Sequence, residues 1–301
     1  MSIHASRTSR LIRATPFFYG WVILGVGTWG SVMMGASQTF TFGLFIDALV
    51  TDLHLARATV SLLYGLATLG ASFLLPLVGR SLDRYGARYV MIAATLGFGL
   101  ACMAMAGVQG GVTLLLGLLA LRFLGFGAMH LVSTTLITQW FIRRRGLVMG
   151  LAGQSLAISL FIYPPLGEWL IAHFAWRGAW IAFGLIVWTM MVPIGWFFYR
   201  DKPELYGLSP DGERTDAPQD KRATGDNEIN WTLAEARRTG AFWIFAAALS
   251  VTAMVTAGLV FHQTSLFVER GLSRESAVGI FQVVALGSIA GNLLMGRLLD
   301  R

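Results

Sequence analysis

Long stretches of this 301-residue chain contain no charged residue. Two of them, residues 89–121 and 241–268, exceed the roughly 20 residues that an α-helix needs to cross the hydrocarbon core of a bilayer. Backbone polar groups within a bilayer must be hydrogen-bonded inside the protein, so apolar runs of this length predict helices. The sequence therefore predicts an all-α polytopic membrane protein.

Composition supports the same fold class. Hydrophobic residues make up 55% of the chain and charged residues 13%, whereas soluble domains carry about 25% charged residues. A net charge of +7 would suggest nucleic-acid binding in a soluble protein. Here the basic residues lie in alternate loops, so the charge indicates topology and no nucleic-acid partner is predicted. The single cysteine, Cys102, lies in an apolar span, and we expect no metal site and no cofactor.

Eight membrane-spanning helices are predicted, and the distribution of Lys and Arg orients them. Eighteen of the 23 basic residues lie on the side that holds the N-terminus and residues 199–239, against four on the opposite side. Cytoplasmic loops carry the excess of positive charge, so we expect the N-terminus in the cytoplasm and the lipid bilayer as a partner. The predicted spans are residues 18–48, 59–78, 89–107, 112–139, 145–167, 176–198, 240–267 and 275–295.

One sequence segment occurs twice, 217 positions apart. Gly79-Arg80-Ser81-Leu82-Asp83-Arg84 is matched by Gly296-Arg297-Leu298-Leu299-Asp300-Arg301. Upstream, Asp52, Leu55, Arg57, Thr59 and Gly70 fall opposite Glu269, Leu272, Arg274, Ser276 and Gly287. A membrane protein built from similar halves is typical of secondary transporters, with the substrate site between the halves. The predicted division is 1–198, a six-helix N-terminal bundle; 199–239, a cytoplasmic linker; and 240–301, an incomplete C-terminal bundle.

Several motifs resemble the major facilitator superfamily. Residues 79–88 resemble its signature between helices 2 and 3, and Leu118-x-x-x-Arg122-x-x-Gly125-x-Gly127 is similar to its intramembrane arginine motif. Residues 17–21, 141–153 and 200–212 resemble the bacterial monocarboxylate and oxalate/formate antiporter-like group. The resemblance implies a major facilitator fold with a complete N-terminal bundle plus helices 7 and 8. It also implies a C-terminally truncated chain.

The repeated motif is a candidate conformational gate. Gly79 and Gly86 are expected to allow a tight turn. Asp83 is expected to pair with a cation or a helix N-terminus and so hold the cytoplasmic face closed. The predicted gate residues are Gly79, Asp83, Arg84, Gly86, Arg88, Gly296, Asp300 and Arg301.

Arg122 is the leading candidate for a substrate or coupling site. A charge near the middle of the membrane costs about 2.5–3.5 kcal/mol on insertion scales, so its side chain should face the bundle interior and be paired. At the spacing of an α-helix, Arg122, Met129 and Ser133 share one face. The arginine either binds an anion or couples to a proton, or it has a structural role bonded to helix carbonyls; both readings remain open.

The other site candidates are polar residues inside predicted spans. Each has the alternative role of an interhelical hydrogen bond. Residues 276–295 contain no arginine, although an oxalate/formate-like carrier is expected to have one in helix 8; this argues against dicarboxylates. The candidates are Gln38, Tyr64, His130, Gln154, Tyr163, His262 and Gln282.

The sequence predicts a transporter and not an enzyme, because no catalytic motif is found outside a membrane span. We expect a secondary active carrier of a small organic anion, monocarboxylate-like, working by alternating access as an antiporter or symporter. Protons are a candidate coupling ion, and the expected location is a bacterial inner membrane. Two alternatives remain: a non-transporting fragment of such a carrier, and a carrier of a drug, sugar or amino acid.

Overall fold

The computed structural model describes residues 10–212 and 233–299. Within these ranges the chain is helical and contains no strand, which confirms the all-α prediction. Among the described residues, five helices are long and apolar enough to cross a membrane, and a pair of helices bent by 67° makes a sixth when it is counted as one broken span. The five are α5 (Arg57–Tyr85), α6 (Ala87–Met105), Gly111–Trp140, α9 (Arg145–Phe198) and α11 (Gly240–Glu269).

The predicted first span, residues 18–48, is broken in the middle. It consists of α2 (Gly20–Met33), the 3-10 turn η1 (Met34–Ser37), α3 (Thr39–Gly43) and, after the bend, α4 (Ile46–Leu53). Gln38 between η1 and α3 is extended, with φ −77° and ψ 153°. Non-helical backbone at membrane depth is tolerated where it is buried in protein or lines a cavity. The break therefore marks a place where neighbouring helices supply the missing hydrogen bonds.

The fourth predicted span also departs from a regular α-helix. It runs through α7 (Gly111–Leu121), a π-helical segment η2 (Arg122–Met129) and α8 (His130–Trp140). A π-helix bonds residue i to i+5, so its register differs from that of an α-helix. The prediction that Arg122, Met129 and Ser133 share a face rested on α-helical spacing and does not apply across η2.

The repeated motif is mostly helical. Gly79 lies inside α5, six residues before the helix ends at Tyr85, so the prediction of a turn at Gly79 is wrong. A single glycine keeps its backbone hydrogen bonds in a helix and costs only about 1 kcal/mol relative to alanine, so the helix continues through it. Gly86 alone forms the turn, with φ 83°. In the second copy, Gly296 likewise lies inside α12 (Arg274–Leu299), and Asp300 and Arg301 lie outside the described residues.

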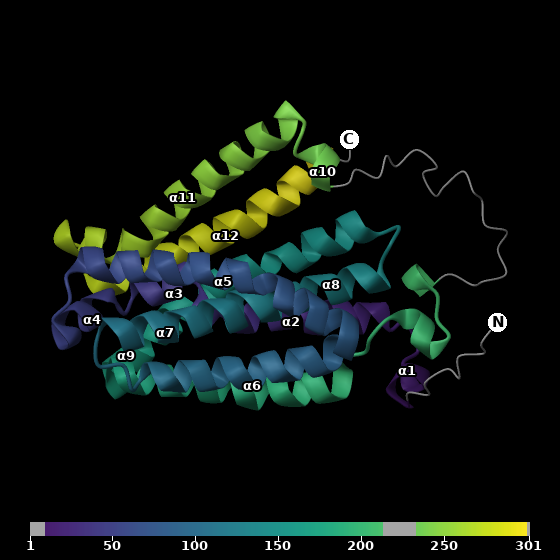
Figure 1. Ribbon diagram of the computed structural model, residues 1–301, viewed down its shortest axis with the longest axis horizontal. Helices are drawn as coiled ribbons and strands as arrows, with labels where there is room; N and C mark the ends of the chain where they lie inside the picture. The colour runs from purple at the N-terminus through teal and green to yellow at the C-terminus, as the bar shows by residue number, and fades with distance from the viewer. Residues whose placement is uncertain (1–9, 213–232, 300–301) are drawn as a thin grey trace.

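The helix α9 contains the two spans predicted at 145–167 and 176–198. Its backbone is helical on both sides of Ala175, which has φ 54° and ψ 173° and reverses the chain. The long helices run along the longest dimension of the molecule, and α11 diverges from the others (Figure 1).

The segment after α9 packs against one end of the bundle. It contains the 3-10 turns η3 (Pro203–Tyr206) and η4 (Pro210–Gly212). The Trp140 indole donates to the Asp201 carbonyl oxygen at 2.8 Å. The Asp211 carboxylate accepts the backbone amides of Ile142 and Arg143 at 2.9 and 2.8 Å. The first part of the predicted linker is thus docked onto the turns between helices; residues 213–232 lie outside the described part of the chain.

Candidate functional site

The broken first span and the π-helical segment meet at Arg122. The side chain is 6% exposed, and its Nη1 donates to the Ser37 carbonyl oxygen at 2.9 Å. In a continuous helix that carbonyl would accept the amide of Thr41, but here the Thr41 amide bonds to the Gln38 carbonyl oxygen at 3.1 Å. Arg122 therefore satisfies the backbone group that the break leaves without a partner.

Two aromatic rings flank the guanidinium. Its central carbon lies 5.3 Å from the centroid of Tyr64, on α5, and 4.3 Å from that of Phe126, on η2. The Tyr64 hydroxyl is hydrogen-bonded to that of Thr39 at 2.9 Å, just after the break. Aromatic faces attract cations, most strongly where water is excluded. The site thus holds a positive charge with a carbonyl and two rings, and no acid contacts Arg122 among the described residues.

Three nitrogen atoms at or beside this cluster lack hydrogen-bond partners among the described residues. They are Nε of Arg122, Nε2 of Gln38 and Nδ1 of His130, and each is buried. Gln38 follows Ser37, which holds Arg122, and the His130 ring stacks on Phe126 with centroids 6.1 Å apart. Buried polar groups are nearly always bonded to protein, water or a ligand. These unpartnered nitrogen atoms make this cluster a candidate ligand site.

The remaining candidates are more scattered. Tyr163, on α9, donates to the carbonyl oxygen of Met33 at 3.1 Å. Met33 is the last residue of α2, so Tyr163 contacts the broken span just before its irregular part. Its ring would lie 2.2 Å from a Cβ at Gly35, so the close approach requires glycine there. The side-chain oxygen of the half-buried Gln154 likewise has no hydrogen-bond partner in the described part of the chain. His262 contacts Phe261, which itself packs on Tyr64. Gln282, on α12, is half-buried, and it has no hydrogen bond to these groups among the described residues.

The turn at Gly86, within the predicted gate, is contacted by an acid other than Asp83. Asp83 is exposed and, within the described part of the chain, has no hydrogen bond or ion pair. Asp201 instead lies beside the turn: its Oδ1 accepts the Arg88 amide at 3.4 Å and would be 2.6 Å from a Cβ at Gly86. The guanidinium groups of Arg84 and Arg88 stack on Tyr85 and Trp196 at 5.2 and 4.7 Å.

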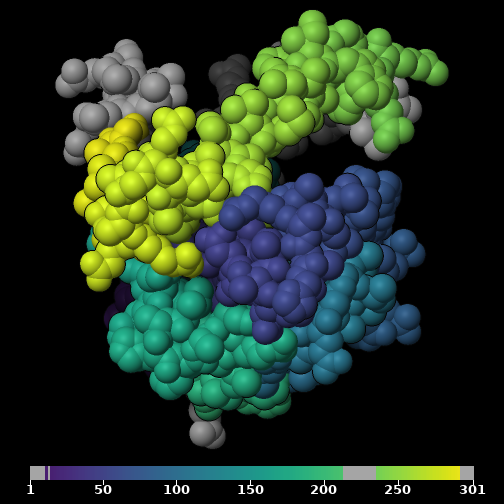
Figure 2. All heavy atoms as spheres, turned by 90° about the vertical axis from the view of Figure 1, so that its left-hand side faces the viewer, coloured from purple at the N-terminus to yellow at the C-terminus, as the bar shows by residue number. Residues whose placement is uncertain are grey.

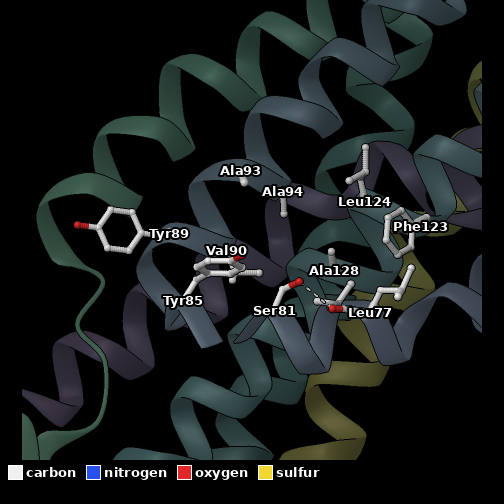
Figure 3. Close-up of a pocket in the computed structure, with 11 residues that line it drawn as sticks. Leu77, Ser81, Tyr85, Tyr89, Val90, Ala93, Ala94, Phe123, Leu124 and Ala128 are labelled. Carbon is white, nitrogen blue, oxygen red and sulfur yellow. Dashed lines mark hydrogen bonds between the residues drawn. The ribbon is translucent and has the colours of Figure 1, made fainter. Parts of the chain in front are cut away.

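A cavity of about 520 Å³ lies between α5, α6 and η2, and Figure 3 shows its lining. Tyr85 and Tyr89 lie at one end and Phe123 and Leu124 at the other. The Ser81 hydroxyl within it is already bonded to the Leu77 carbonyl oxygen at 2.8 Å. The lining supplies no cation, so the cavity does not have the chemistry of an anion site.

A group of ion pairs at the opposite end of the bundle was missed in the sequence. Asp47 pairs with Arg57 at 2.6 Å and with Arg274 at 3.4 Å, and Arg274 also pairs with Glu168 at 2.7 Å. An acid inside a predicted span is a functional candidate by default, so Asp47, within 18–48, could have been found. Glu168 lies one residue beyond the predicted span 145–167, so it was not an acid inside a predicted span and could not be found in the same way.

Comparisons with known proteins place this architecture in a family. Residues 14–301 match the family described as Major Facilitator Superfamily. The chain is 24% identical to an uncharacterized MFS-type transporter, YhjX of Escherichia coli, over 88% of this chain and 62% of the relative. It is 26% identical to monocarboxylate transporter 13 of Bos taurus over 56% of this chain and 39% of the relative. It is 28% identical to a probable sulfoacetate transporter, SauU of Cupriavidus necator, over 40% of this chain and 28% of the relative.

The chain spans about three fifths of the length of the first of these relatives and less of the others. The relatives are described as transporters and none as an enzyme. Since the family match extends over nearly all of a polytopic helical chain, this protein belongs to the Major Facilitator Superfamily of membrane transporters.

Proposed function

We propose that the chain carries the anion-binding part of a secondary transporter for small monocarboxylate-like anions, with Arg122 as the binding cation. The transporter would lie in a bacterial inner membrane with its N-terminus in the cytoplasm. Residues 1–198 and 240–301 would belong to its two bundles, which move relative to each other during alternating access.

The absence of an acid beside Arg122 among the described residues is the observation that carries this proposal. A purely structural arginine at this depth would be expected to pair with an acid or to bond several backbone carbonyls. Arg122 instead bonds one carbonyl oxygen and leaves its Nε unused. A small anion would supply the missing negative charge and accept that donor.

Its neighbours suit a small carboxylate. Gln38 and His130 offer further nitrogen atoms, and Tyr64 and Phe126 form an apolar wall for a short carbon chain. The names of two relatives, a monocarboxylate transporter and a probable sulfoacetate transporter, refer to anionic substrates. Those names support the anionic class, and the arginine supplies the physical reason for it.

Ligand-dependent thermal unfolding of the purified chain in detergent tests the proposal. Propionate and sulfoacetate are the probes, and propionamide is the uncharged control. A ligand at 100 times its Kd stabilises the folded state by about 2.7 kcal/mol. We expect both anions to raise the Tm, propionamide to leave it unchanged, and the effect to vanish in Arg122→Gln. Equal anion-induced shifts in Arg122→Gln, or no shift with either anion, would contradict the proposal.

A further inference from the structure

The ion pairs at the end of the bundle opposite Gly86 link helices on the two sides of the 199–239 segment. Asp47, on α4, accepts hydrogen bonds from Arg57 on α5 at 2.6 Å and from Ser265 on α11 at 3.3 Å. Arg274, the first residue of α12, reaches the same carboxylate at 3.4 Å. Figure 2 looks onto this end, where the yellow start of α12 lies against purple and teal helices.

Arg274 makes two further contacts across the same boundary. Its Nε donates to both carboxylate oxygens of Glu168 on α9, at 2.7 and 2.8 Å. Its Nη2 donates to the Leu44 carbonyl oxygen at 2.7 Å. Leu44 lies in the bend between α3 and α4, where the carbonyl is free to accept. A single arginine therefore binds three groups of the preceding helices.

The internal repeat relates the two arginines that meet at Asp47. Arg57 and Arg274 occupy equivalent positions, 217 residues apart, and each is the first residue of its helix, α5 and α12. The position equivalent to Asp47 is Thr264 on α11. Thr264 is 2% exposed, and its hydroxyl has no hydrogen-bond partner within the described residues. Both arginines thus contact Asp47, and Arg274 has a second carboxylate partner in Glu168 but no acid at the equivalent position of its own copy.

We propose that Asp47 is a positioning residue for transport: Arg57 on the neighbouring helix holds its carboxylate, which keeps this end of the pathway closed by binding Arg274 and Ser265 across the 199–239 boundary. The proposal builds on the alternating-access function above, since this end must open for substrate to pass. Opening would require Arg274 to leave Asp47 and Glu168 together. The same movement would separate α11 and α12 from α4 and α9.

These ion pairs are weak enough to break and re-form as this end of the pathway opens and closes. The side chains of Asp47, Arg57 and Arg274 are each about one third exposed, at 38%, 37% and 33%. Ion pairs exposed to this extent are weaker than fully buried ones, because water competes for both charges. Gly43 sets the spacing nearby: a Cβ there would lie 2.7 Å from the Phe261 carbonyl oxygen, so α3 and α11 are in close backbone contact. Close packing and breakable ion pairs occur together at this end.

Spin-label distance measurements on the full chain in liposomes test the proposal. Labels are placed on Ala58→Cys and Leu272→Cys, both exposed positions beside the two arginines, in a Cys102→Ala background. The parent should give mainly the short distance of the closed state. Asp47→Asn should raise the ratio of long to short distances roughly fivefold or more, the lower end of typical coupling between sites. Asp47→Glu should restore the short distance, which a general packing defect would not allow.

Asp52→Asn is the matched control. Asp52 pairs with Arg177 at 2.8 Å at the same end, but both residues precede the 199–239 segment, so its loss should leave the distance unchanged. Arg274→Gln is the second test variant and should lengthen the distance even if Asp47→Asn does not fold. Unchanged distances in every variant that folds would overturn the proposal. These measurements need no substrate, so their result is independent of whether Arg122 binds an anion.

Discussion

Arg122 donates a 2.9 Å hydrogen bond to the carbonyl oxygen of Ser37, 85 residues away in sequence. The arginine opens the π-helical segment of the fourth span, and the carbonyl ends the 3-10 turn of the first. This hydrogen bond therefore joins the two irregular segments. The charge is placed where two helices both depart from regular backbone bonding, which is typical of ligand sites in transporters.

Arg122→Ala should destabilise the protein even without ligand. The substitution leaves the Ser37 carbonyl buried and unbonded, which costs about 1–3 kcal/mol. Thermal unfolding in detergent measures the loss. The exposed Arg80→Ala is the control and should change stability by less than about 0.5 kcal/mol. Equal stability of the two variants would show that the contact with Ser37 contributes little.

Gly86→Ala should destabilise the protein, whereas Gly79→Ala should be neutral or stabilising. Gly86 has φ 83° and ψ 163°, a region that costs other residues about 1–3 kcal/mol, and its added Cβ would meet Asp201 at 2.6 Å. Gly79 is helical with nothing within 4 Å of an added Cβ, and alanine is favoured there by up to about 1 kcal/mol. Unfolding midpoints of the two variants should move in opposite directions; a comparable loss in both would contradict the assignment of the turn to Gly86.

Asp211→Asn should loosen the loop between α8 and α9. The carboxylate accepts three consecutive amides, those of Ile142, Arg143 and Arg144, at 2.9, 2.8 and 3.3 Å. Asparagine tolerates the positive φ of 62° but offers only one acceptor oxygen and no charge. Hydrogen exchange of the amides of residues 142–144 should become faster. The control is Asp83→Asn, at an exposed acid that has no hydrogen bond within the described ranges, and it should leave the exchange of these amides unchanged. Unaltered exchange in Asp211→Asn would rule out this carboxylate as the anchor of the segment.

Gly43→Ala should force α3 and α11 apart. The added Cβ would meet the Phe261 carbonyl oxygen at 2.7 Å, a backbone atom that cannot rotate away, and overpacking costs about 1–3 kcal/mol. The label pair at positions 58 and 272 should report a longer distance. Gly65→Ala, with nothing within 4 Å of the new Cβ, should keep the parent distance. A short distance in both would mean that α11 accommodates the methyl group by a local adjustment.

The features predictable from the sequence are those that depend on local composition. Helices across the membrane follow from apolar length alone, and the chain reversal at Ala175 falls between the predicted spans 145–167 and 176–198. The turn at Gly86 follows from the special freedom of glycine. The involvement of Arg122 in an interior contact follows from the cost of placing a charge in the membrane.

The features that could not be predicted depend on contacts between distant residues. Nothing in residues 37–39 requires a break; it persists because Arg122, from another helix, bonds the Ser37 carbonyl. The π-helical register likewise changes which side chains share a face. Asp83 was expected to pair at the turn, but Asp201, brought there by the segment after α9, occupies that position.

The unequal halves of the repeat have a consequence for how the two parts of the chain are joined. Had the second copy kept an acid at the position of Thr264, Arg274 could have paired with it in its own half of the repeat. Instead, Arg274 contacts Asp47, Glu168 and the Leu44 carbonyl oxygen, which all precede the 199–239 segment. Movement of α12 away from the preceding helices must therefore break these three contacts together.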